Sequence, residues 1–279
     1  MHSTIDRLAF TYLTHLRYSG RPRLSVRDVA ALRSLSDPGP RSASRPPVFQ
    51  QTTRPAAEPP PRQTTAPAVI PSQDSWQRLE EDLKDCQACA LARQGRKTIV
   101  MGEGNRQADI MLIGEGPGFD EDRLGRPFVG KSGQKLDQIM LAVGFQREEL
   151  YIANVVKCRP PGNRNPEPGE ISICQQFLQR QIRLVNPRFI LALGKFAANF
   201  LYGESGAPRT LGSMREKILH YGDIQVVVTY HPSALLRNDS LRRPVWDDVR
   251  VLRNLYDTAR QEPLRFPAEL KYPVVQDVE

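Results

Sequence analysis

The chain has 279 residues, of which 39% are hydrophobic and 25% charged, so it can bury the core of one large domain and carry a polar attachment. It has no apolar run of roughly 18 residues, so no membrane-spanning helix is expected, and its four cysteines are too few for a disulfide scaffold. The formal charge of +8 favours an anionic partner, with nucleic acid first.

Much of the positive charge lies near the N-terminus. Residues 1–75 hold ten Arg and five acidic residues, a net +5, which leaves +3 for residues 76–279. Apolar residues at helical spacing predict one amphipathic helix over residues 4–17 and a second over 25–35. We therefore expect a small helical extension over residues 1–36. It is either a dispensable accessory or a tether to a protein partner or to DNA.

Residues 37–75 are expected to form a disordered linker. Residues 37–71 contain ten prolines and few aliphatic or aromatic side chains, so burial cannot offset the entropy of ordering them. The N-terminus lacks the apolar core of a secretory signal. We expect a cytoplasmic monomer, associated with the nucleoid if the source is a bacterium, with an organellar transit peptide as the alternative for the Arg-rich N-terminus.

From residue 76 onward, short apolar runs alternate with helical patterns. The strand and helix pairs cover residues 109–116 and 133–144, 151–158 and 170–185, 188–194 and 195–203, and 224–232 and 246–259. Strands that are each followed by a helix predict a parallel sheet with helices on both faces. We expect a three-layer α/β/α domain over residues 76–261 with a central, mainly parallel four-stranded sheet, and a tail over 262–279. Ligands of such sheets bind beyond the C-terminal ends of the strands.

The loop after the first expected strand, GEGPGFDED, is rich in glycine and in acidic residues. Its glycines at positions 114, 116 and 118 miss the G-x-G-x-x-G spacing of a dinucleotide site, and Pro117 removes a backbone donor. The three acidic residues 120–122 would repel a pyrophosphate. We therefore do not expect a dinucleotide cofactor in this loop.

The four cysteines form a C-x2-C pair, Cys86 and Cys89, and a C-x15-C pair, Cys158 and Cys174. Cys158 ends an expected strand and Cys174 lies in the first turns of an expected helix, so the four thiols can converge at one edge of the sheet. Four thiolates bind either a tetrahedral zinc ion or an iron–sulfur cluster. The spacing alone does not choose between them.

Two polar residues stand out near strand ends. His231, in TYHPSALLR, follows a strand, and the rigid turn at Pro232 aims its ring into the expected ligand crevice beside the hydroxyl of Ser233. Asn154, in YIANVVKC, lies within a strand pattern, where a buried carboxamide is costly unless it is paired. Each residue taken alone is more often structural than functional.

Three motifs taken together resemble those of the family 4 uracil-DNA glycosylases, the iron–sulfur members of the uracil-DNA glycosylase superfamily. They are GEGPGFDEDRLGRPFVGKSGQKLD, NVVKCRPPGNRNP with the paired cysteines, and TYHPSALLR. The resemblance covers roughly residues 80–258. It implies a monofunctional hydrolase for base excision repair that flips deoxyuridine out of single- or double-stranded DNA, cleaves the N-glycosidic bond, releases uracil and leaves an abasic site.

The resemblance also implies how uracil is recognised. Phe128 would be the aromatic platform on which the flipped base stacks. Asn154 would pair with the uracil edge and reject cytosine, whose donors and acceptors are reversed. The side chain of Glu121 would lie beside C5 and exclude the methyl group of thymine.

A dissociative mechanism is expected from what the loop lacks. The position at which the best-known uracil glycosylases carry a water-positioning Asp is here Gly116, so the bond to the base should break first. His231 would stabilise the charge on uracil O2, and Glu115 or Glu121 would stabilise the cationic sugar or orient water. The backbone around Glu115, Gly116 and Gly118 would wrap the base.

The resemblance further implies DNA contacts and a [4Fe–4S] cluster. Ser233 would contact a phosphate, and Leu235 would wedge into the space that the flipped base leaves. The other expected contacts to the DNA backbone are Lys131, Ser132, Lys157, Arg159, Arg164 and Arg237. The cluster would bind Cys86, Cys89, Cys158 and Cys174 and pin the loop between the last two.

Two other classes of protein are alternatives to an active glycosylase. One is a catalytically weak or inactive protein that binds or traps uracil-DNA, and the other is an iron–sulfur redox or scaffold protein. The chain lacks the basic, His-containing insertion of the trapping relatives, and Phe128, Asn154 and His231 are intact, so both rank second. Activity on other deaminated bases, such as hypoxanthine or xanthine, stays open.

Overall fold

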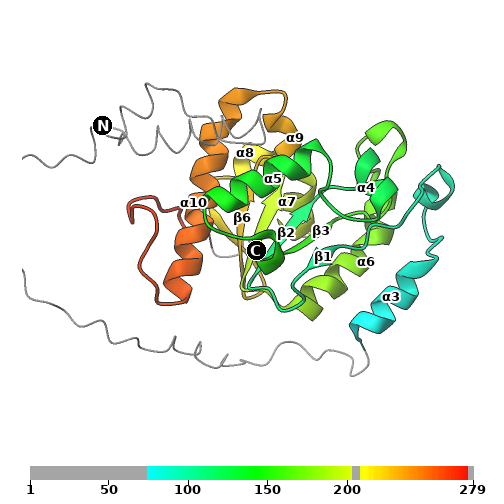
Figure 1. Ribbon diagram of the computed structural model, residues 1–279, viewed down its shortest axis with the longest axis horizontal. Coiled ribbons are helices and arrows are strands. Elements are labelled where there is room, and N and C mark those ends of the chain that lie inside the picture. The colour runs from blue at the N-terminus through cyan, green and yellow to red at the C-terminus, as the bar shows by residue number, and fades with distance from the viewer. Residues whose placement is uncertain (1–73, 203–207, 276–279) are drawn as a thin grey trace, which may run out of the picture. The chain divides into compact units, whose positions relative to one another are not determined.

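The computed structural model describes residues 74–202 and 208–275, all within a compact unit that spans Pro59–Glu279 (Figure 1). The helices expected over residues 4–17 and 25–35, and the linker as far as residue 73, lie outside the described residues. No helix in the described part of the chain is both long enough and apolar enough to cross a membrane.

A six-stranded sheet with the order β1-β3-β2-β4-β6-β5 forms the centre of the fold. Its strands are β1 (Glu103–Gly104), β2 (Ile110–Gly114), β3 (Tyr151–Asn154), β4 (Phe189–Leu193), β5 (Ile218–Tyr221) and β6 (Ile224–Thr229). The four inner strands are parallel, which confirms the predicted parallel core. The outer strands β1 and β5 are antiparallel, and the sequence did not predict them.

Helices cover both faces of this sheet, as predicted (Figure 1). The α-helices are α3 (Trp76–Lys84), α4 (Phe119–Leu124), α5 (Lys131–Ala142), α6 (Pro168–Val185), α7 (Lys195–Tyr202), α8 (Leu211–Met214), α9 (Pro232–Leu235) and α10 (Arg242–Ala259). Single 3-10 turns are η1 (Ala90–Arg93), η2 (Arg147–Glu149), η3 (Pro161–Asn163) and η4 (Asp239–Leu241).

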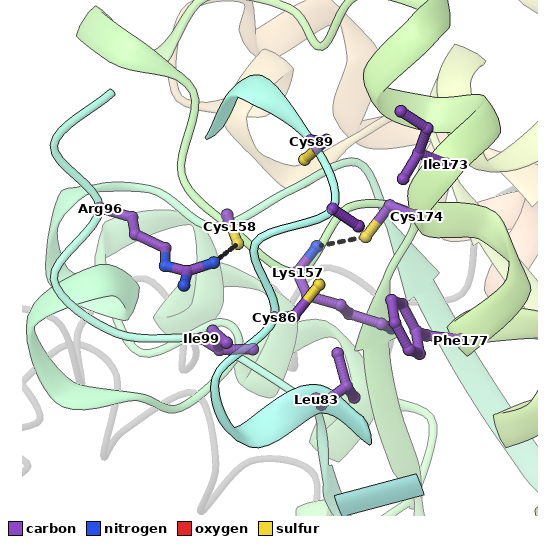
Figure 2. A pocket seen from close by; sticks show the side chains of 11 residues that line it. Leu83, Cys86, Cys89, Arg96, Ile99, Lys157, Cys158, Ile173, Cys174 and Phe177 are labelled. Carbon is purple, nitrogen blue, oxygen red and sulfur yellow. Dashed lines mark hydrogen bonds between the residues drawn. The ribbon is translucent and has the colours of Figure 1, made fainter. Parts of the chain in front are cut away.

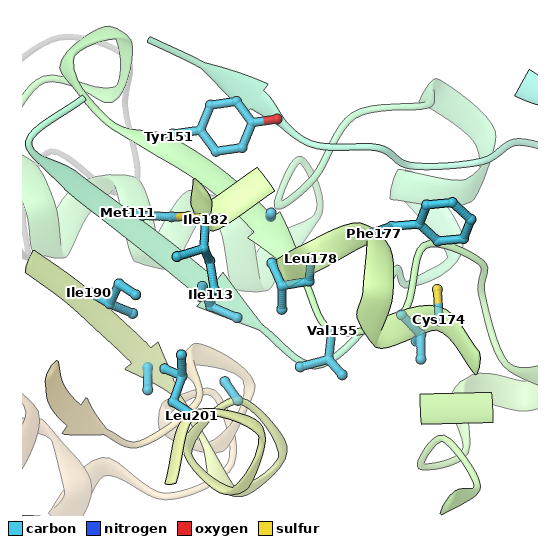
Figure 3. Packing of buried hydrophobic residues seen from close by; sticks show 14 of the residues in the cluster. Met111, Ile113, Tyr151, Val155, Cys174, Phe177, Leu178, Ile182, Ile190 and Leu201 are labelled. Carbon is cyan, nitrogen blue, oxygen red and sulfur yellow. The ribbon is translucent and has the colours of Figure 1, made fainter. Parts of the chain in front are cut away.

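Alternate residues along each inner strand supply two hydrophobic cores. Ile110 and Leu112 of β2 pack with side chains of α5 and α10 on one face. Met111 and Ile113 pack with α6 and α7 on the other face, where Figure 3 shows them near Ile182 of α6. Each fully buried side chain of this size stabilises the fold by about 1.5–3 kcal/mol. Because strands buried on both faces are almost wholly apolar, a polar residue at a strand end stands out.

After α10, the chain returns to the sheet rather than leaving the domain. Val274 forms a bridge with Ile218 of β5, and the hydroxyl of Tyr272 donates a 2.7 Å hydrogen bond to the carboxylate of Asp248 in α10. Asp248 also accepts from the hydroxyl of Thr229, at 2.6 Å, at the end of β6. The C-terminal segment is thereby connected to the strand that leads to His231.

Candidate active site

Three of the residues predicted for base binding and catalysis meet beyond the ends of β2, β3 and β6: Phe128, Asn154 and His231. Gly114 ends β2 and lies opposite Asn154, which ends β3. A Cβ atom on Gly114 would collide with the side-chain oxygen of Asn154 and would lie 2.5 Å from Cζ of Phe128, so both side chains cover this glycine. The ring centroid of Phe128 lies 5.6 Å from that of His231. Only a glycine at the end of β2 leaves room for this arrangement.

The side chain of Asn154 is buried with its oxygen unpaired among the described residues. It is 1% exposed, and its Oδ1 atom has no hydrogen-bond partner among the described residues. A buried carbonyl oxygen without a donor costs about 1–3 kcal/mol. The main-chain oxygen of Asn154, by contrast, accepts a 2.7 Å hydrogen bond from the ammonium of Lys157. The unpaired amide oxygen is therefore a site for a donor that a ligand brings.

His231 has one defined tautomer. Its Nδ1 atom accepts the main-chain N–H of Ser233 at 3.2 Å and lies 2.8 Å from the Ser233 hydroxyl. Because an amide N–H can only donate, Nδ1 carries no proton and the neutral ring carries its proton on Nε2. Burial, and then the positive charge of Arg237, lowers the pKa of His231 to about 4. The ring is therefore a neutral Nε2–H donor at pH 7.

The backbone of Phe128 is strained. Its φ of 51° lies in the left-handed region, which is unfavourable for a bulky side chain and costs about 1–3 kcal/mol. The loop is clamped from two sides. Arg147 donates to the carbonyl oxygens of Pro127, at 2.6 Å, and of Phe128, at 3.3 Å. Glu121 accepts from the amides of residues 129 and 130, at 3.0 and 2.9 Å.

Arg147 is itself fixed by two acidic side chains. It donates to Glu103 of β1, at 2.6 Å, and to Asp137 of α5, at 2.7 Å. Burial opposes ionisation of Glu103, but hydrogen bonds from Arg126 and Arg147 hold its pKa below the ordinary value. Arg147 was not predicted from the sequence, because a lone arginine between an expected helix and an expected strand shows no pattern that separates it from a surface residue.

The two candidate carboxylates of the glycine loop have different surroundings. Glu121 is buried, and besides residues 129 and 130 it accepts from the amide of Gly118, at 3.1 Å. Burial raises the pKa of Glu115 to about 7, and in the part of the chain that the structure describes its carboxylate has no hydrogen bond or ion pair. The loop between them packs tightly, since a Cβ on Gly116 would lie 2.7 Å from Cγ2 of Val156.

The four cysteines converge on one small, apolar cavity, as the sequence predicted (Figure 2). Arg96 donates to Sγ of Cys158 at 3.1 Å, and the main-chain amide of Lys157 donates to Sγ of Cys174 at 3.3 Å. Burial raises the pKa of Cys158, and it raises that of Cys174 to about 11. Within residues 74–202 and 208–275, no group of three or more His, Cys, Asp or Glu is arranged to hold a single metal ion.

Two residues expected at DNA are buried. Lys157 is 1% exposed and its ammonium donates to Asn154 and Gln181, so the expectation that it contacts the DNA backbone was wrong. Leu235, the predicted wedge, packs into the core beside α5 and α10, and the exposed leucine of this turn is Leu236.

The other expected DNA contacts lie nearer the surface. Arg164 makes a two-pronged ion pair with Glu170, at 2.6 and 2.9 Å, at the start of α6. Arg159 donates to Asn163 at 2.7 Å and also lies against the ring of Phe119. The remaining residues are exposed or half-buried: Lys131, Ser132, Ser233 and Arg237.

Known proteins with similar sequences match this region. The family model of the "Uracil DNA glycosylase superfamily" matches residues 101–251. The chain is 44% identical over 174 residues to the type-4 uracil-DNA glycosylase of Thermotoga maritima, which covers 61% of this chain and 89% of that protein. It is 38% identical over 194 residues to the type-4 enzyme of Sulfurisphaera tokodaii (67% and 88% covered). It is 34% identical over 198 residues to that of Archaeoglobus fulgidus (69% and 98% covered).

Proposed function

The chain belongs to the uracil-DNA glycosylase superfamily and, within it, to the type-4 uracil-DNA glycosylases, and we propose that the pocket of Phe128, Asn154 and His231 excises uracil from DNA. The protein is a DNA-repair hydrolase. It breaks the N-glycosidic bond of deoxyuridine, releases uracil and leaves an abasic site. Since a base inside a duplex is out of reach, the nucleotide must be flipped into the pocket.

The unpaired oxygen of Asn154 is the observation that carries this assignment. A uracil stacked on Phe128 presents N3–H, which donates to Oδ1 of Asn154, and O4, which accepts from its amide group. Cytosine has an acceptor at N3 and a donor at C4, so it would leave both the oxygen and the nitrogen of the Asn154 amide group unpaired. A mismatch of this kind rejects strongly, because the desolvated groups of the site lose their water without gaining a partner.

His231 supplies the main electrostatic contribution. When the bond between C1′ of the sugar and N1 of the base breaks, its electron pair leaves with uracil, and negative charge develops on O2. The Nε2–H of the neutral ring, whose tautomer Ser233 sets, donates to that oxygen. A fixed donor in a buried pocket needs no reorganisation at the moment of reaction.

The sugar that remains is cationic, and water adds to C1′ and gives up a proton. Gly116 offers no carboxylate for this step. Of the two remaining acidic residues, Glu121 is held by three main-chain amides, whereas Glu115 is half-buried and its carboxylate is without such partners in the described part of the chain. We therefore assign stabilisation of the cation, or orientation of the water, to Glu115, and positioning of the Phe128 loop to Glu121.

The cysteine cavity supports a [4Fe–4S] cluster. All four thiols line one cavity, and a set of four thiolates suits either a [4Fe–4S] cluster or a tetrahedral zinc ion. The resemblance to the iron–sulfur uracil-DNA glycosylases favours the cluster. The cluster would act as a structural cross-link. It would join the segment after α3, which carries Cys86 and Cys89, to the segment between β3 and α6, which carries Cys158, and to α6 itself, which carries Cys174. Arg96 and the amide of Lys157 would then donate to its thiolates and offset their charge.

The assignment is tested by alkali cleavage of an end-labelled oligonucleotide with one uracil, using the wild-type protein, Asn154→Ala and His231→Ala. Wild-type protein should produce cleavage at uracil alone, with no cleavage when cytosine or thymine replaces it. Both variants should cut much more slowly while keeping their circular dichroism and visible absorbance. A wild-type protein with intact absorbance that leaves uracil in place would instead favour a binding or scaffold protein.

A further inference from the structure

An exposed aromatic ring lies beside the proposed pocket and has no role in it. Phe119, the first residue of α4, is 53% exposed, and it is the one aromatic among the large exposed hydrophobic side chains of the described residues. Exposure of a phenyl ring to water is unfavourable by about 25 cal/mol per Å² of apolar surface. A ring that is left open next to a ligand site is a candidate contact for that ligand.

Two cationic side chains flank the ring. The guanidinium carbon of Arg159 lies 5.1 Å from the ring centroid of Phe119, and Nζ of Lys97 lies 5.9 Å from it. Arg159 donates to the uncharged side chain of Asn163. Within the part of the chain that the structure describes, neither cation forms an ion pair with an acidic residue. The nearby acidic side chain of Asp120 is instead 4.0 Å from Arg123.

The group of Phe119, Arg159 and Lys97 connects the two loops that border the base pocket. Phe119 directly follows Gly118 in the loop after β2, and Arg159 directly follows Cys158 in the loop after β3. These loops touch, because Gly116 packs against Val156. Phe119 and Arg159 therefore extend from the two loops that follow the strands ending at Gly114 and Asn154.

We propose that Phe119, Arg159 and Lys97 form a subsite for the nucleotide next to the flipped uridine. An unpaired base stacks on Phe119, and its phosphate is bound by the two cations, as in proteins that combine aromatic platforms with positive charge to hold single strands. A base that is paired in a duplex already stacks on its neighbours, so the subsite favours single-stranded DNA. The inference rests on the proposed glycosylase function and adds a second binding position to it.

The test compares Phe119→Ala and Phe119→Trp with Leu124→Ala. Leu124 ends the same helix and is also 53% exposed, so its substitution controls for loss of exposed apolar surface. On a single-stranded oligonucleotide with one uracil, Phe119→Ala should raise KM about tenfold with little change in kcat, as expected for a lost stacking contact. Phe119→Trp should match or improve on the wild type, Leu124→Ala should equal it, and duplex substrates should show a smaller effect.

A second set of substrates identifies the occupant. The bases on either side of uracil are replaced one at a time by a tetrahydrofuran abasic residue. If a neighbouring base stacks on Phe119, one of these substrates raises KM for the wild type as much as Phe119→Ala does, and it raises KM no further for the variant. Equal KM values for Phe119→Ala, Leu124→Ala and wild type, or independent effects of variant and abasic substitution, would overturn the subsite. A wild type that excises no uracil would refute the glycosylase assignment instead.

Discussion

The guanidinium of Arg147 lies 3.3 Å from the carbonyl oxygen of Phe128 and donates a hydrogen bond to it. Its other arm donates to Pro127, and Glu103 and Asp137 hold the guanidinium in place. A strained residue keeps its conformation only where its surroundings determine it. Arg147 thus links Glu103 of β1 and Asp137 of α5 to the backbone conformation that orients the Phe128 ring in the proposed pocket.

Replacing this arginine should loosen the stacking platform. In Arg147→Met the carbonyls of Pro127 and Phe128 lose their donor, and Phe128 can relax out of the left-handed region. Because about 1–3 kcal/mol of strain is then released in the free enzyme but must be restored to bind uracil, kcat/KM should fall by about tenfold to a hundredfold. Steady-state excision kinetics measure the loss.

A double-mutant cycle separates positioning from general stability. If Arg147 acts through Phe128, Arg147→Met should have little further effect in a Phe128→Ala background. Arg253→Met is the matched control, since Arg253 also pairs with a carboxylate, that of Asp257, and donates to a main-chain oxygen, that of Gly144. It should lower the melting temperature and leave kcat/KM of the folded protein unchanged. Additive losses of kcat/KM would contradict the clamp.

The tautomer of His231 should be visible directly. Because its pKa is lowered to about 4, the ring should stay neutral, with its proton on Nε2, from mildly acidic to alkaline pH. Nitrogen-15 shifts of the imidazole measure this. Ser233→Ala removes the hydroxyl but keeps the amide donor, so kcat should fall by only about twofold to tenfold, against about a hundredfold or more for His231→Ala. A ring that titrates near pH 6.5 would contradict the assignment.

The pH dependence should report Glu115. Its pKa is raised to about 7 by burial, so the carboxyl group is neutral below that pH and charged above it. Only the charged form stabilises a cationic sugar, and kcat/KM should therefore rise with pH through about 7 and then level off. Glu115→Gln, which is neutral at every pH, should lower kcat by about a hundredfold and abolish this rise. A rise that persists in Glu115→Gln would assign it to another group.

Substitution of Gly114 should abolish uracil excision. A Cβ atom there lies too close to both Asn154 and Phe128, so both side chains must shift. Gly114→Ala should therefore lose nearly all uracil excision, measured with excess enzyme. Gly169→Ala is the control, because a Cβ at that helical glycine meets nothing within 4 Å; it should be as active as wild type. Comparable activity of the two variants would mean that Asn154 and Phe128 lie elsewhere when uracil binds.

Each cysteine should be needed for bound iron. Replacing Cys86, Cys89, Cys158 or Cys174 with serine changes little volume but removes a thiolate, so iron and acid-labile sulfide should fall together with visible absorbance and thermal stability. Arg96→Met removes the donor to Cys158 and should keep the iron. Purified wild-type protein that contains stoichiometric zinc and no sulfide would show a mononuclear zinc site instead of a cluster.

The parallel core could be predicted because its signals are local, whereas the roles of the pocket residues were implied by the resemblance to a family. Inner strands appear as apolar runs, and Asn154 and His231 stand out where such runs end. The edge strands gave no such signal. β1 has only two residues, and β5 carries His220 and Tyr221 beside a turn, so neither shows the length or alternation that marks a strand.

The surroundings of a charged side chain depend on contacts that the local sequence does not show. Lys157 has the sequence context of a surface cation. In the structure it is buried, and its ammonium donates a hydrogen bond to the side-chain oxygen of Gln181, 24 residues away. Glu121 reads as an acidic loop residue, and its role in holding residues 129 and 130 follows only from how the loop folds back. Partners of this kind decide whether a charged side chain is buried, and no local pattern carries that information.

The order of the strands along the chain also means that the pocket residues are synthesised in two stages, Phe128 and Asn154 first and His231 later. A chain that has left the ribosome as far as β4 already contains Phe128, Asn154 and all four cysteines. It still lacks β6, which pairs with β4 and leads directly to His231. The residues proposed to bind the base and the cluster are therefore made before His231, and the last parallel strand to be translated completes the proposed pocket.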